Sequence, residues 1–509
     1  MGMIKKLKMK NFFYLIFIIF VALFFYTFNL RYTYFFSGDM ARDTLASLRI
    51  LNSKEITAIG PPLSFGQYGT REIYFSSLTY YAGALSLSFF NKDVLGPIYV
   101  NIFLMILGIF FFYKLACLFL KPKIALLSTL IFSLSTTIVA HMRFFWNPNF
   151  IISLSPIYWY FYFLALNRNR WHDFLLSGLF AGILFHFHYF VIFTLFVSLI
   201  FIFYKNKKGF WLFILAFITV ISPLIIFEIK NKFYLTNAFF YNTTINKDFH
   251  NVYRPIFSRP VWLKITDIFL IPVMFLAFET EATHFPTIVN LNYWSQVLIG
   301  FLMYWLIIYF LKKNQKSFNQ YWIFVFILTS LTAIFSSFLS HEVYYLRYFF
   351  ICLPLLTLII GKTFGNKLFY IFVFIIFLIT DIRILYAQKA HNDLLIKRKS
   401  SYPTIKHMEK VAEIIKKEKP KNPYNITENF IGDARALYLR FFLEKNNQIQ
   451  KPENEINYQN LKELYIFSPS LDDVYKDSRW EFNATLNLKL VKTWHIDKNK
   501  YLFKFEKQI

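Results

Sequence analysis

Cysteine is scarce in this chain, which has only two among its 509 residues. Cys117 and Cys352 both fall inside long apolar stretches, where a thiol acts as a small core side chain. Two cysteines in such positions exclude a disulfide framework as the basis of the fold. They give no indication of the redox compartment.

Acidic residues are also scarce, with 29 Asp and Glu against 55 Lys and Arg, so the formal net charge is +26. A balance this basic is typical of many nucleic-acid-binding proteins. Here, however, the lysines cluster in short segments between apolar runs, where they act as determinants of membrane topology. We therefore exclude nucleic acid as a partner.

Charged residues make up only 17% of the chain, whereas hydrophobic residues make up 56% and the mean hydropathy is +0.42. No single soluble core could bury this much apolar surface. The sequence predicts a polytopic α-helical membrane protein, with the lipid bilayer as a partner and about eleven transmembrane helices. The apolar runs lie at residues 12–30, 94–120, 123–143, 148–166, 174–188, 189–204, 210–228, 294–311, 320–340, 346–361 and 367–387.

The first apolar run, residues 12–30, is too long for a signal-peptide core and lacks a cleavage site, so we expect an uncleaved helix with a cytoplasmic amino end. Basic pairs then occur in every second loop, as the positive-inside rule requires. This predicts a multi-pass protein of the cell inner (plasma) membrane with an extracytoplasmic carboxyl end. Two segments leave alternatives. Residues 73–90 are expected to be an interfacial helix instead of a span, and residues 174–204 two short helices instead of one long one, because these choices keep the basic loops inside.

The composition changes near residue 390, and residues 391–509 are polar with no further span. Their periodicity predicts helices at 404–419 and 432–444 and strands at 463–467, 486–494 and 500–505. The sequence therefore predicts a membrane domain over residues 1–390 and a small extracytoplasmic α/β domain over residues 391–509. The outer loops of the membrane domain are expected at residues 31–93 and 229–293.

Two carboxylates follow the first apolar run closely. Asp39 can cap a new helix, on which the i,i+4 spacing places Asp43 on the same face. A pair of acids at a membrane surface costs free energy, so it indicates chemistry or ion handling more often than packing. The alternative is a solvated helix cap followed by a surface helix that carries Arg42 and Arg49.

Further ionisable residues collect on the predicted outer side, which indicates either a polar cavity or loops that contact water. His186 and His188 could form a metal pair, but their i,i+2 spacing points the rings apart on a helix and favours hydrogen bonding. Arg347 needs an anionic partner or a headgroup, unless it is a snorkelling anchor. The aromatic loop that contains Arg259 is expected to fold over the cavity.

Several motifs follow one another in a fixed order along residues 1–390. They are Gly38-Asp39-Met40-Ala41-Arg42-Asp43, Gly60-Pro61-Pro62, Arg143-Phe144-Phe145-Trp146-Asn147, Gly178 to His188, and His341 to Pro354. This order resembles the GT-C membrane glycosyltransferases of the family 39 type, which include protein O-mannosyltransferases and aminoarabinose transferases. The resemblance implies a polyprenyl-phosphate-linked sugar donor, an extracytoplasmic acceptor and a catalytic acid in the first outer loop, which is Asp39 here.

Sugar transfer to a hydroxyl needs a base for the acceptor proton, and Asp39 is the candidate, with Asp43 as the second catalytic acid. The leaving phosphate needs cationic partners close to the membrane surface, whereas it needs no acid. A single displacement would invert the anomeric configuration. The candidates for substrate binding are Arg42, Arg71, Tyr74, Arg143, His186, His188, Arg259, His341 and Arg347. No metal ligand is assigned and no cofactor is firmly implied, which leaves a divalent metal open.

A transporter or flippase of a lipid-linked glycan is the alternative from another class. The chain has no internal repeat and no matching pair of broken helices, and its acids lie toward the outer face instead of the bilayer midplane. A channel or a scaffold would leave the clustering of charges unexplained. A glycosyltransferase is therefore the preferred interpretation. Three glycosylation sequons, at Asn242, Asn425 and Asn483, are expected by chance in an Asn-rich chain.

Overall fold

The computed structural model describes residues 2–36, 38–54, 56–62, 72–241, 298, 300–302, 305, 346–363, 367–386, 402–420, 424–430, 435–447 and 461–507. The chain divides into two compact units. Unit 1 contains Met1–Phe28, Ile56–Thr79 and Ile98–Ile384. Unit 2 contains Asn29–Glu55, Tyr80–Pro97 and Leu385–Ile509. Each unit therefore combines segments that are far apart in the sequence.

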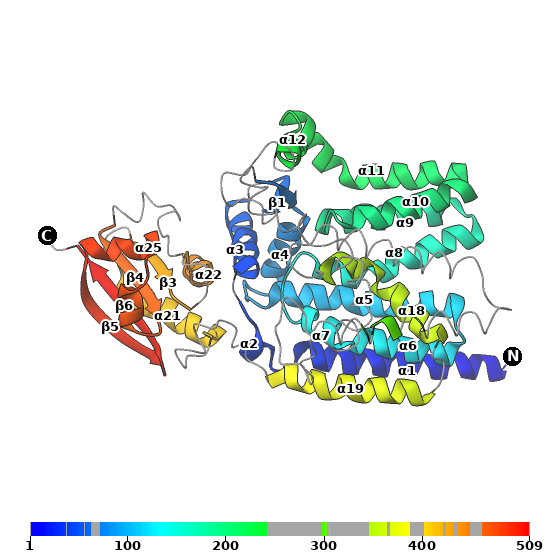
Figure 1. Cartoon of the computed structure of the whole chain (residues 1–509), viewed down its shortest axis with the longest axis horizontal. Coiled ribbons are helices and arrows are strands. Elements are labelled where there is room, and N and C mark those ends of the chain that lie inside the picture. The colour runs from blue at the N-terminus through cyan, green and yellow to red at the C-terminus, as the bar shows by residue number, and fades with distance from the viewer. Residues whose placement is uncertain are drawn as a thin grey trace. The chain divides into compact units, whose positions relative to one another are not determined.

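The described residues of unit 1 are helical apart from the short strand pair β1 (Ile59–Pro62) and β2 (Tyr74–Ser76), and the long helices run roughly parallel to one another (Figure 1). The helices are α1 (Gly2–Thr27), most of α5 (Gly96–Phe119), α6 (Pro122–Leu134), α7 (Thr136–Met142), α8 (Asn149–Arg168), α9 (Trp171–Phe187), α10 (Val191–Lys205), α11 (Lys207–Lys230), α12 (Tyr234–Phe240), the 3-10 helix η4 (Leu346–Cys352), α18 (Leu353–Thr363) and α19 (Lys367–Tyr386).

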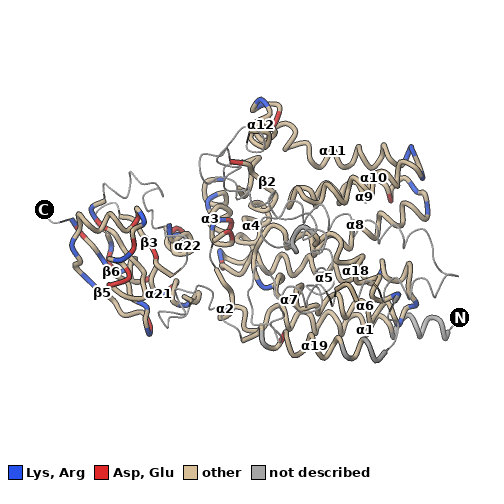
Figure 2. Tube along the Cα trace, viewed as in Figure 1, with Lys and Arg blue, Asp and Glu red and all other residues tan. Residues whose placement is uncertain are grey.

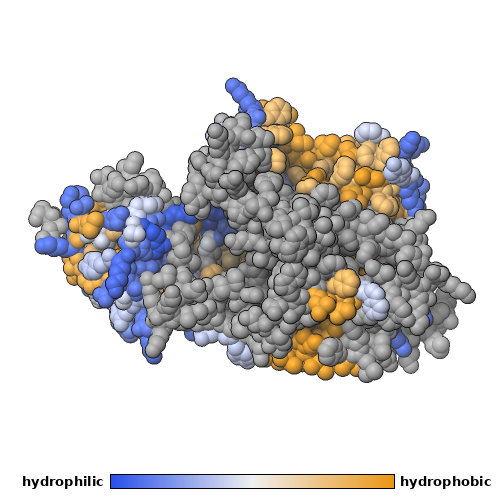
Figure 3. Space-filling model, viewed as in Figure 1, coloured by the Kyte–Doolittle hydropathy of each residue, from blue (hydrophilic) through white to orange (hydrophobic). Residues whose placement is uncertain are grey.

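Three helices among the described residues, α5, α8 and α11, are long and apolar enough to cross a membrane. Helices α6 and α7 would form a fourth span, bent by 51°, if they cross together. Helix α11 leaves Trp211, Leu215 and Ile226 exposed, and Figure 3 shows an apolar surface in the region of this helix. Basic residues lie at the loop between α10 and α11 (Figure 2). Apolar flanks with basic ends are typical of lipid-facing helices.

The structure shows how both of the segments with alternatives fold. Residues 174–204 form two helices, α9 and α10, which confirms the prediction of two short helices. The expected helix at 73–90 is wrong at its start, because β2 (Tyr74–Ser76) pairs antiparallel with β1 (Ile59–Pro62) before α4 (Leu78–Phe89) begins. A Cβ atom at Gly60 would lie 2.1 Å from the Ser76 carbonyl oxygen, so this close approach requires glycine. The count of eleven spans stays a prediction, since residues 320–340 and most of 294–311 lie outside the described residues.

Unit 2 contains an α/β domain from the end of the chain together with earlier helices. Its elements are α2 (Leu30–Thr33), α3 (Gly38–Ser53), most of α4, α21 (Ile405–Glu418), β3 (Tyr424–Glu428), α22 (Leu437–Lys445), β4 (Glu463–Ser468), α24 (Leu471–Tyr475), α25 (Trp480–Asn483), η5 (Ala484–Asn487), β5 (Lys489–Asp497) and β6 (Lys500–Glu506). The sheet order is β3-β4-β6-β5, with β3 and β4 parallel and the other pairs antiparallel. Leu464, Ile466, Phe482, Phe503 and Phe505 form its core.

The secondary structure of this domain follows the predicted pattern with several differences, among them the short elements α24, α25 and η5, which were not predicted. Helix α22 begins at Leu437 instead of 432, and β5 begins at Lys489 because residues 484–487 form η5. Strand β3 was not predicted, because the polar residues in its sequence do not indicate a buried strand. In the structure, all of its residues are buried. Asn425 lies buried within β3, so its sequon is closed in the folded domain, whereas Asn483 is exposed. Asn242 lies outside the described residues.

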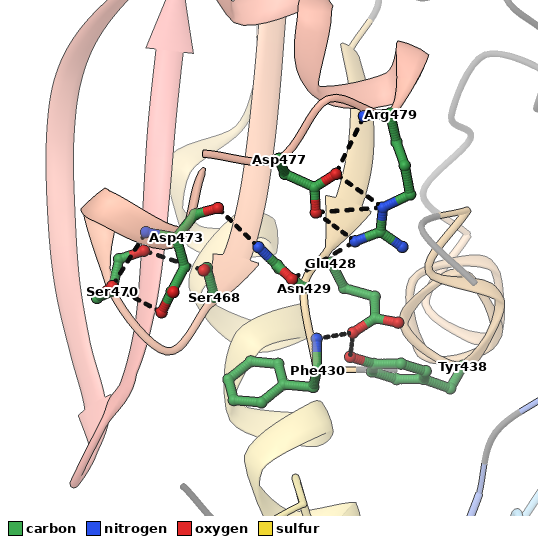
Figure 4. A network of polar contacts seen from close by, with 9 residues as sticks. All are labelled: Glu428, Asn429, Phe430, Tyr438, Ser468, Ser470, Asp473, Asp477 and Arg479. Atoms are coloured by element: carbon green, nitrogen blue, oxygen red, sulfur yellow. Dashed lines mark hydrogen bonds and ion pairs between the residues drawn. The ribbon is translucent and has the colours of Figure 1, made fainter. Parts of the chain in front are cut away.

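Polar side chains fill the carboxyl edge of the parallel pair β3 and β4 (Figure 4). The Glu428 carboxylate accepts hydrogen bonds from the Phe430 amide at 2.6 Å and from the Tyr438 hydroxyl at 3.2 Å. The Asn429 amide donates to the Asp473 carbonyl oxygen at 2.9 Å. Ligands often bind at this edge of open α/β sheets. Here the side chains of the domain itself occupy it.

Candidate active site

Helix α3 carries both predicted catalytic acids, and acidic and basic residues lie close together along it (Figure 2). Gly38 begins the helix with a φ of +48°, a conformation that glycine adopts without strain. Asp39 therefore lies in the first turn of α3, not at the cap position that we expected. A carboxylate in the first turn is stabilised by the positive end of the helix dipole.

Arg42 joins the two acids. Its Nη1 atom lies 2.7 Å from Asp39 Oδ1, and its Nε atom lies 2.8 Å from Asp43 Oδ1. The two carboxylates differ in exposure, because the side chain of Asp39 is 44% exposed and that of Asp43 is fully buried. Asp39 can therefore meet a substrate from solvent, whereas Asp43 holds the arginine from inside.

Burial dominates the electrostatics of Asp43. It raises the pKa of Asp43 to about 6, and the charge of Asp39 acts in the same direction while Arg42 opposes both. The Oδ2 atom of Asp43 is buried and has no hydrogen-bond partner among the described residues. Burial alone would lower the pKa of Arg42, but the charges of Asp43 and Asp39 outweigh it, so this pKa lies above its ordinary value. Arg42 thus keeps its positive charge.

Tyr80 is a site residue that the sequence reasoning missed. It lies on α4 within unit 2, where burial and then the charge of Asp43 raise the pKa of its hydroxyl, while Arg42 lowers it. Tyr80 therefore stays neutral beside the charged cluster. The tyrosine-rich start of α4 was the only signal for it, and that signal does not distinguish Tyr80 from its neighbours.

His186 and Tyr74 belong to unit 1, where they fix the β1–β2 hairpin. The Nε2 atom of His186 donates to the Val220 carbonyl oxygen at 2.9 Å, so in the neutral ring Nδ1 accepts from the Ser76 hydroxyl. The Tyr189 hydroxyl donates to the Tyr74 carbonyl oxygen at 2.8 Å. This arrangement uses both nitrogens of His186 in hydrogen bonds, which is the role that the residue spacing favoured.

His188 contacts the same hairpin. Its ring centroid lies 5.0 Å from that of Phe75 on β2, and its Nδ1 atom accepts from the Phe190 amide at 3.3 Å. Over the described ranges, no group of three or more His, Cys, Asp or Glu side chains could hold a metal ion. His186 and His188 thus act on the hairpin through separate contacts.

Arg143 is buried at the end of α7 in unit 1. Its Nη1 and Nη2 atoms donate to the carbonyl oxygens of Phe25 at 2.7 Å and Phe28 at 2.9 Å. These carbonyls belong to the last turn of α1 and the residue after it, so Arg143 stabilises that helix end. The sequence reasoning also missed Asp381, a buried acid on α19. A single acid inside an apolar run was the signal for it.

The structure does not describe the side chains of the four remaining candidates for substrate binding. The backbone of Arg347 belongs to η4, and its side chain is outside the description. Arg71, Arg259 and His341 lie outside the described residues. The structure therefore brings together Asp39, Arg42, Asp43 and Tyr80 in unit 2, and Tyr74, His186 and His188 in unit 1.

Comparison with known proteins gives one family match and several structural matches. Residues 77–227 match the family described as dolichyl-phosphate-mannose-protein mannosyltransferase. No match is found among curated protein sequences.

Three solved structures have a similar fold. ArnT from Cupriavidus metallidurans bound to undecaprenyl phosphate is 10% identical, with a TM-score of 0.59 over 96% of this chain and 97% of that chain. The apo state of the same protein gives a TM-score of 0.58 with the same identity and coverage. The apo oligosaccharyltransferase from Archaeoglobus fulgidus is 11% identical, with a TM-score of 0.50 over 89% of this chain and 69% of that chain. Residues 77–227 thus match the protein mannosyltransferase family and the chain has a fold similar to that of ArnT, and both findings confirm the resemblance drawn from its sequence.

Proposed function

We propose that this protein is a membrane glycosyltransferase that moves a sugar from a polyprenyl-phosphate donor to an extracytoplasmic acceptor. The observation that carries the proposal is the cluster of Asp39, Arg42 and Asp43 at the start of α3. Two comparisons support it: the mannosyltransferase domain at residues 77–227, and the similar fold of ArnT, whose structure holds undecaprenyl phosphate.

Asp39 is the proposed general base. Its carboxylate accepts the proton of the acceptor hydroxyl while the hydroxyl oxygen forms a bond to the anomeric carbon of the sugar. The bond between that carbon and the phosphate oxygen breaks, and the polyprenyl phosphate leaves with the bonding electrons. This single displacement inverts the anomeric configuration. The 44% exposure of the Asp39 side chain suits a base that must reach an incoming hydroxyl.

Arg42 orients the base and supplies positive charge beside it. Its bond to Asp39 at 2.7 Å fixes the carboxylate, and its bond to Asp43 at 2.8 Å fixes the guanidinium. The negative charge that develops on the leaving phosphate is stabilised by a preorganised cation more strongly than by water. Asp43 therefore supports the reaction through Arg42, and we expect its loss to weaken transfer less than the loss of Asp39.

The remaining assignments extend the same proposal. Arg71, Arg259, His341 and Arg347 are proposed to bind the donor or the acceptor. Arg143 is kept as a weaker candidate for phosphate binding, because two of its nitrogen atoms already donate to carbonyl oxygens. The proposed location is the inner membrane, with the amino end in the cytoplasm and the domain of residues 391–509 outside. A divalent metal is left open.

The test is a transfer assay with purified protein in liposomes. Polyprenyl-phosphate mannose and polyprenyl-phosphate aminoarabinose are the donor probes, and an extract of envelope proteins and lipids supplies acceptors. We expect a glycosylated product with inverted anomeric configuration, which nuclear magnetic resonance of the product identifies. Movement of the donor lipid between leaflets without any product would overturn the proposal in favour of a carrier. Product of retained configuration would overturn the single displacement.

A further inference from the structure

The segment before Asp39 is anchored in the α/β domain of unit 2. Phe36 is fully buried, and its ring meets the edges of the Phe441 and Phe442 rings at centroid distances of 5.5 Å and 6.1 Å. The Tyr402 hydroxyl donates to the Phe36 carbonyl oxygen at 3.2 Å. Both the ring and the backbone of Phe36 are thus fixed immediately before α3 begins.

The far half of α3 is held by an ion pair with the same domain. Arg49 places Nε 2.9 Å from Glu444 Oε2 and Nη2 2.6 Å from Glu444 Oε1. This two-point pairing fixes direction as well as distance, because both planar groups must be aligned. Glu444 belongs to α22, the helix that also carries Phe441 and Phe442.

A third connection lies just before α3. Arg31 on α2 pairs with Asp93 at 2.9 Å and with Glu409 on α21 at 2.6 Å. The partners Glu409 and Glu444 lie about 400 residues from their arginines in sequence. The α/β domain therefore contacts the segment of Asp39 on both sides of the acid.

We infer that the α/β domain is a positioning element for the acid-bearing helix α3, with Glu444, acting through Arg49, as a positioning residue. This inference rests on the proposed function. A shift of about 1 Å in a reacting group can slow catalysis by about 100-fold. The Arg49–Glu444 pair is partly exposed, with side chains 48% and 19% accessible, so it adds little to global stability. Its loss should therefore change turnover more than folding.

Charge reversal separates positioning from stability. Arg49→Glu and Glu444→Arg each place like charges opposite one another, and the double variant restores an opposite-charge pair. With a polyprenyl-phosphate sugar as donor, we expect each single variant to lower kcat about tenfold with the donor KM within about twofold. The double variant should return to within about threefold of the wild type. Glu418→Lys, which disrupts the Lys492–Glu418 pair in the same domain, is the matched control and should keep wild-type turnover.

Amide hydrogen exchange of residues 38–53 gives a second readout that needs no activity. Faster exchange of α3 in both single variants, with recovery in the double variant, supports the inference. This result stands even if the wild type forms no glycosylated product, because the absence of product would refute only the proposed function. Unchanged exchange in both single variants would overturn the inference. So would wild-type kcat in both single variants, or a loss of kcat that the double variant does not recover.

Discussion

The Nε atom of Arg42 lies 2.8 Å from the Oδ1 atom of Asp43, whose side chain is fully buried. The same guanidinium binds Asp39 through Nη1 at 2.7 Å. One cation therefore couples an exposed acid to a buried one, so that a change at any of the three residues alters the other two.

Removal of Arg42 should destabilise the protein. Arg42→Ala leaves the buried carboxylate of Asp43 without its cation, which costs about 3 kcal/mol of unfolding free energy and raises the pKa of Asp43 further. Thermal unfolding in detergent measures the loss. Arg42→Lys keeps a charge and should recover part of it. A melting temperature of Arg42→Ala equal to that of the wild type would show that the pair does not stabilise the fold.

Asp43 should make stability depend on pH. Burial raises its pKa from 3.8 to about 6, so between these values the folded state binds more protons than the unfolded state. The free energy of unfolding contributed by Asp43 therefore falls as the pH rises from about 4 to about 6, and is constant above that range. The melting temperature of the wild type relative to Asp43→Asn, measured from about pH 4 to pH 7, should fall accordingly. A difference that rises or stays constant over this range would contradict the raised pKa.

Ser76→Ala should weaken unit 1. It leaves the Nδ1 atom of buried His186 without its donor, and we expect a loss of about 1–2 kcal/mol in unfolding free energy. Ser222→Ala is the control, because the Ser222 hydroxyl donates to the Thr219 carbonyl oxygen within its own helix, and it should change stability by less than about 0.5 kcal/mol. Equal stability of the two variants would show that the hydrogen bond between Ser76 and His186 does not stabilise the hairpin.

Topology can be tested with reporters. A reporter fused after Lys208 should be cytoplasmic, because that loop carries a cluster of lysines, and one fused after Asn392 should be extracytoplasmic. Protease protection in sealed vesicles gives an independent measurement. A cytoplasmic reporter at Asn392 would reverse the side on which the proposed base meets its acceptor.

The membrane helices of the described segments could largely be predicted from sequence, because long apolar runs with lysines at their ends are local signals. The division between α9 and α10 is an example, since residues 174–204 are too long for one comfortable helix and the positive-inside rule, applied to the basic loops, favours two. The two acids on α3 also followed from local spacing. Local periodicity likewise indicated α21, β4 and β6.

Features that depend on distant partners could not be predicted. Residues 74–76 form a strand because they pair with β1. Residues 424–428 form β3 because they pair with β4 and are buried in the folded domain. The bridge by Arg42 and the position of Tyr80 depend on side-chain direction, which residue spacing does not give. The contact of Phe36 with Phe441 joins segments from opposite ends of the chain.

The most direct test of the account is single-turnover transfer by Asp39→Asn. The amide keeps the shape of the carboxylate but cannot accept the acceptor proton, so we predict that donor binding stays within about threefold of the wild type while the transfer rate falls by at least about 100-fold. Rapid-quench measurement of product from bound polyprenyl-phosphate sugar gives the rate. Asp472→Asn, an exposed acid on α24, is the control. A transfer rate of Asp39→Asn equal to that of the wild type would contradict the assignment of Asp39 as the base.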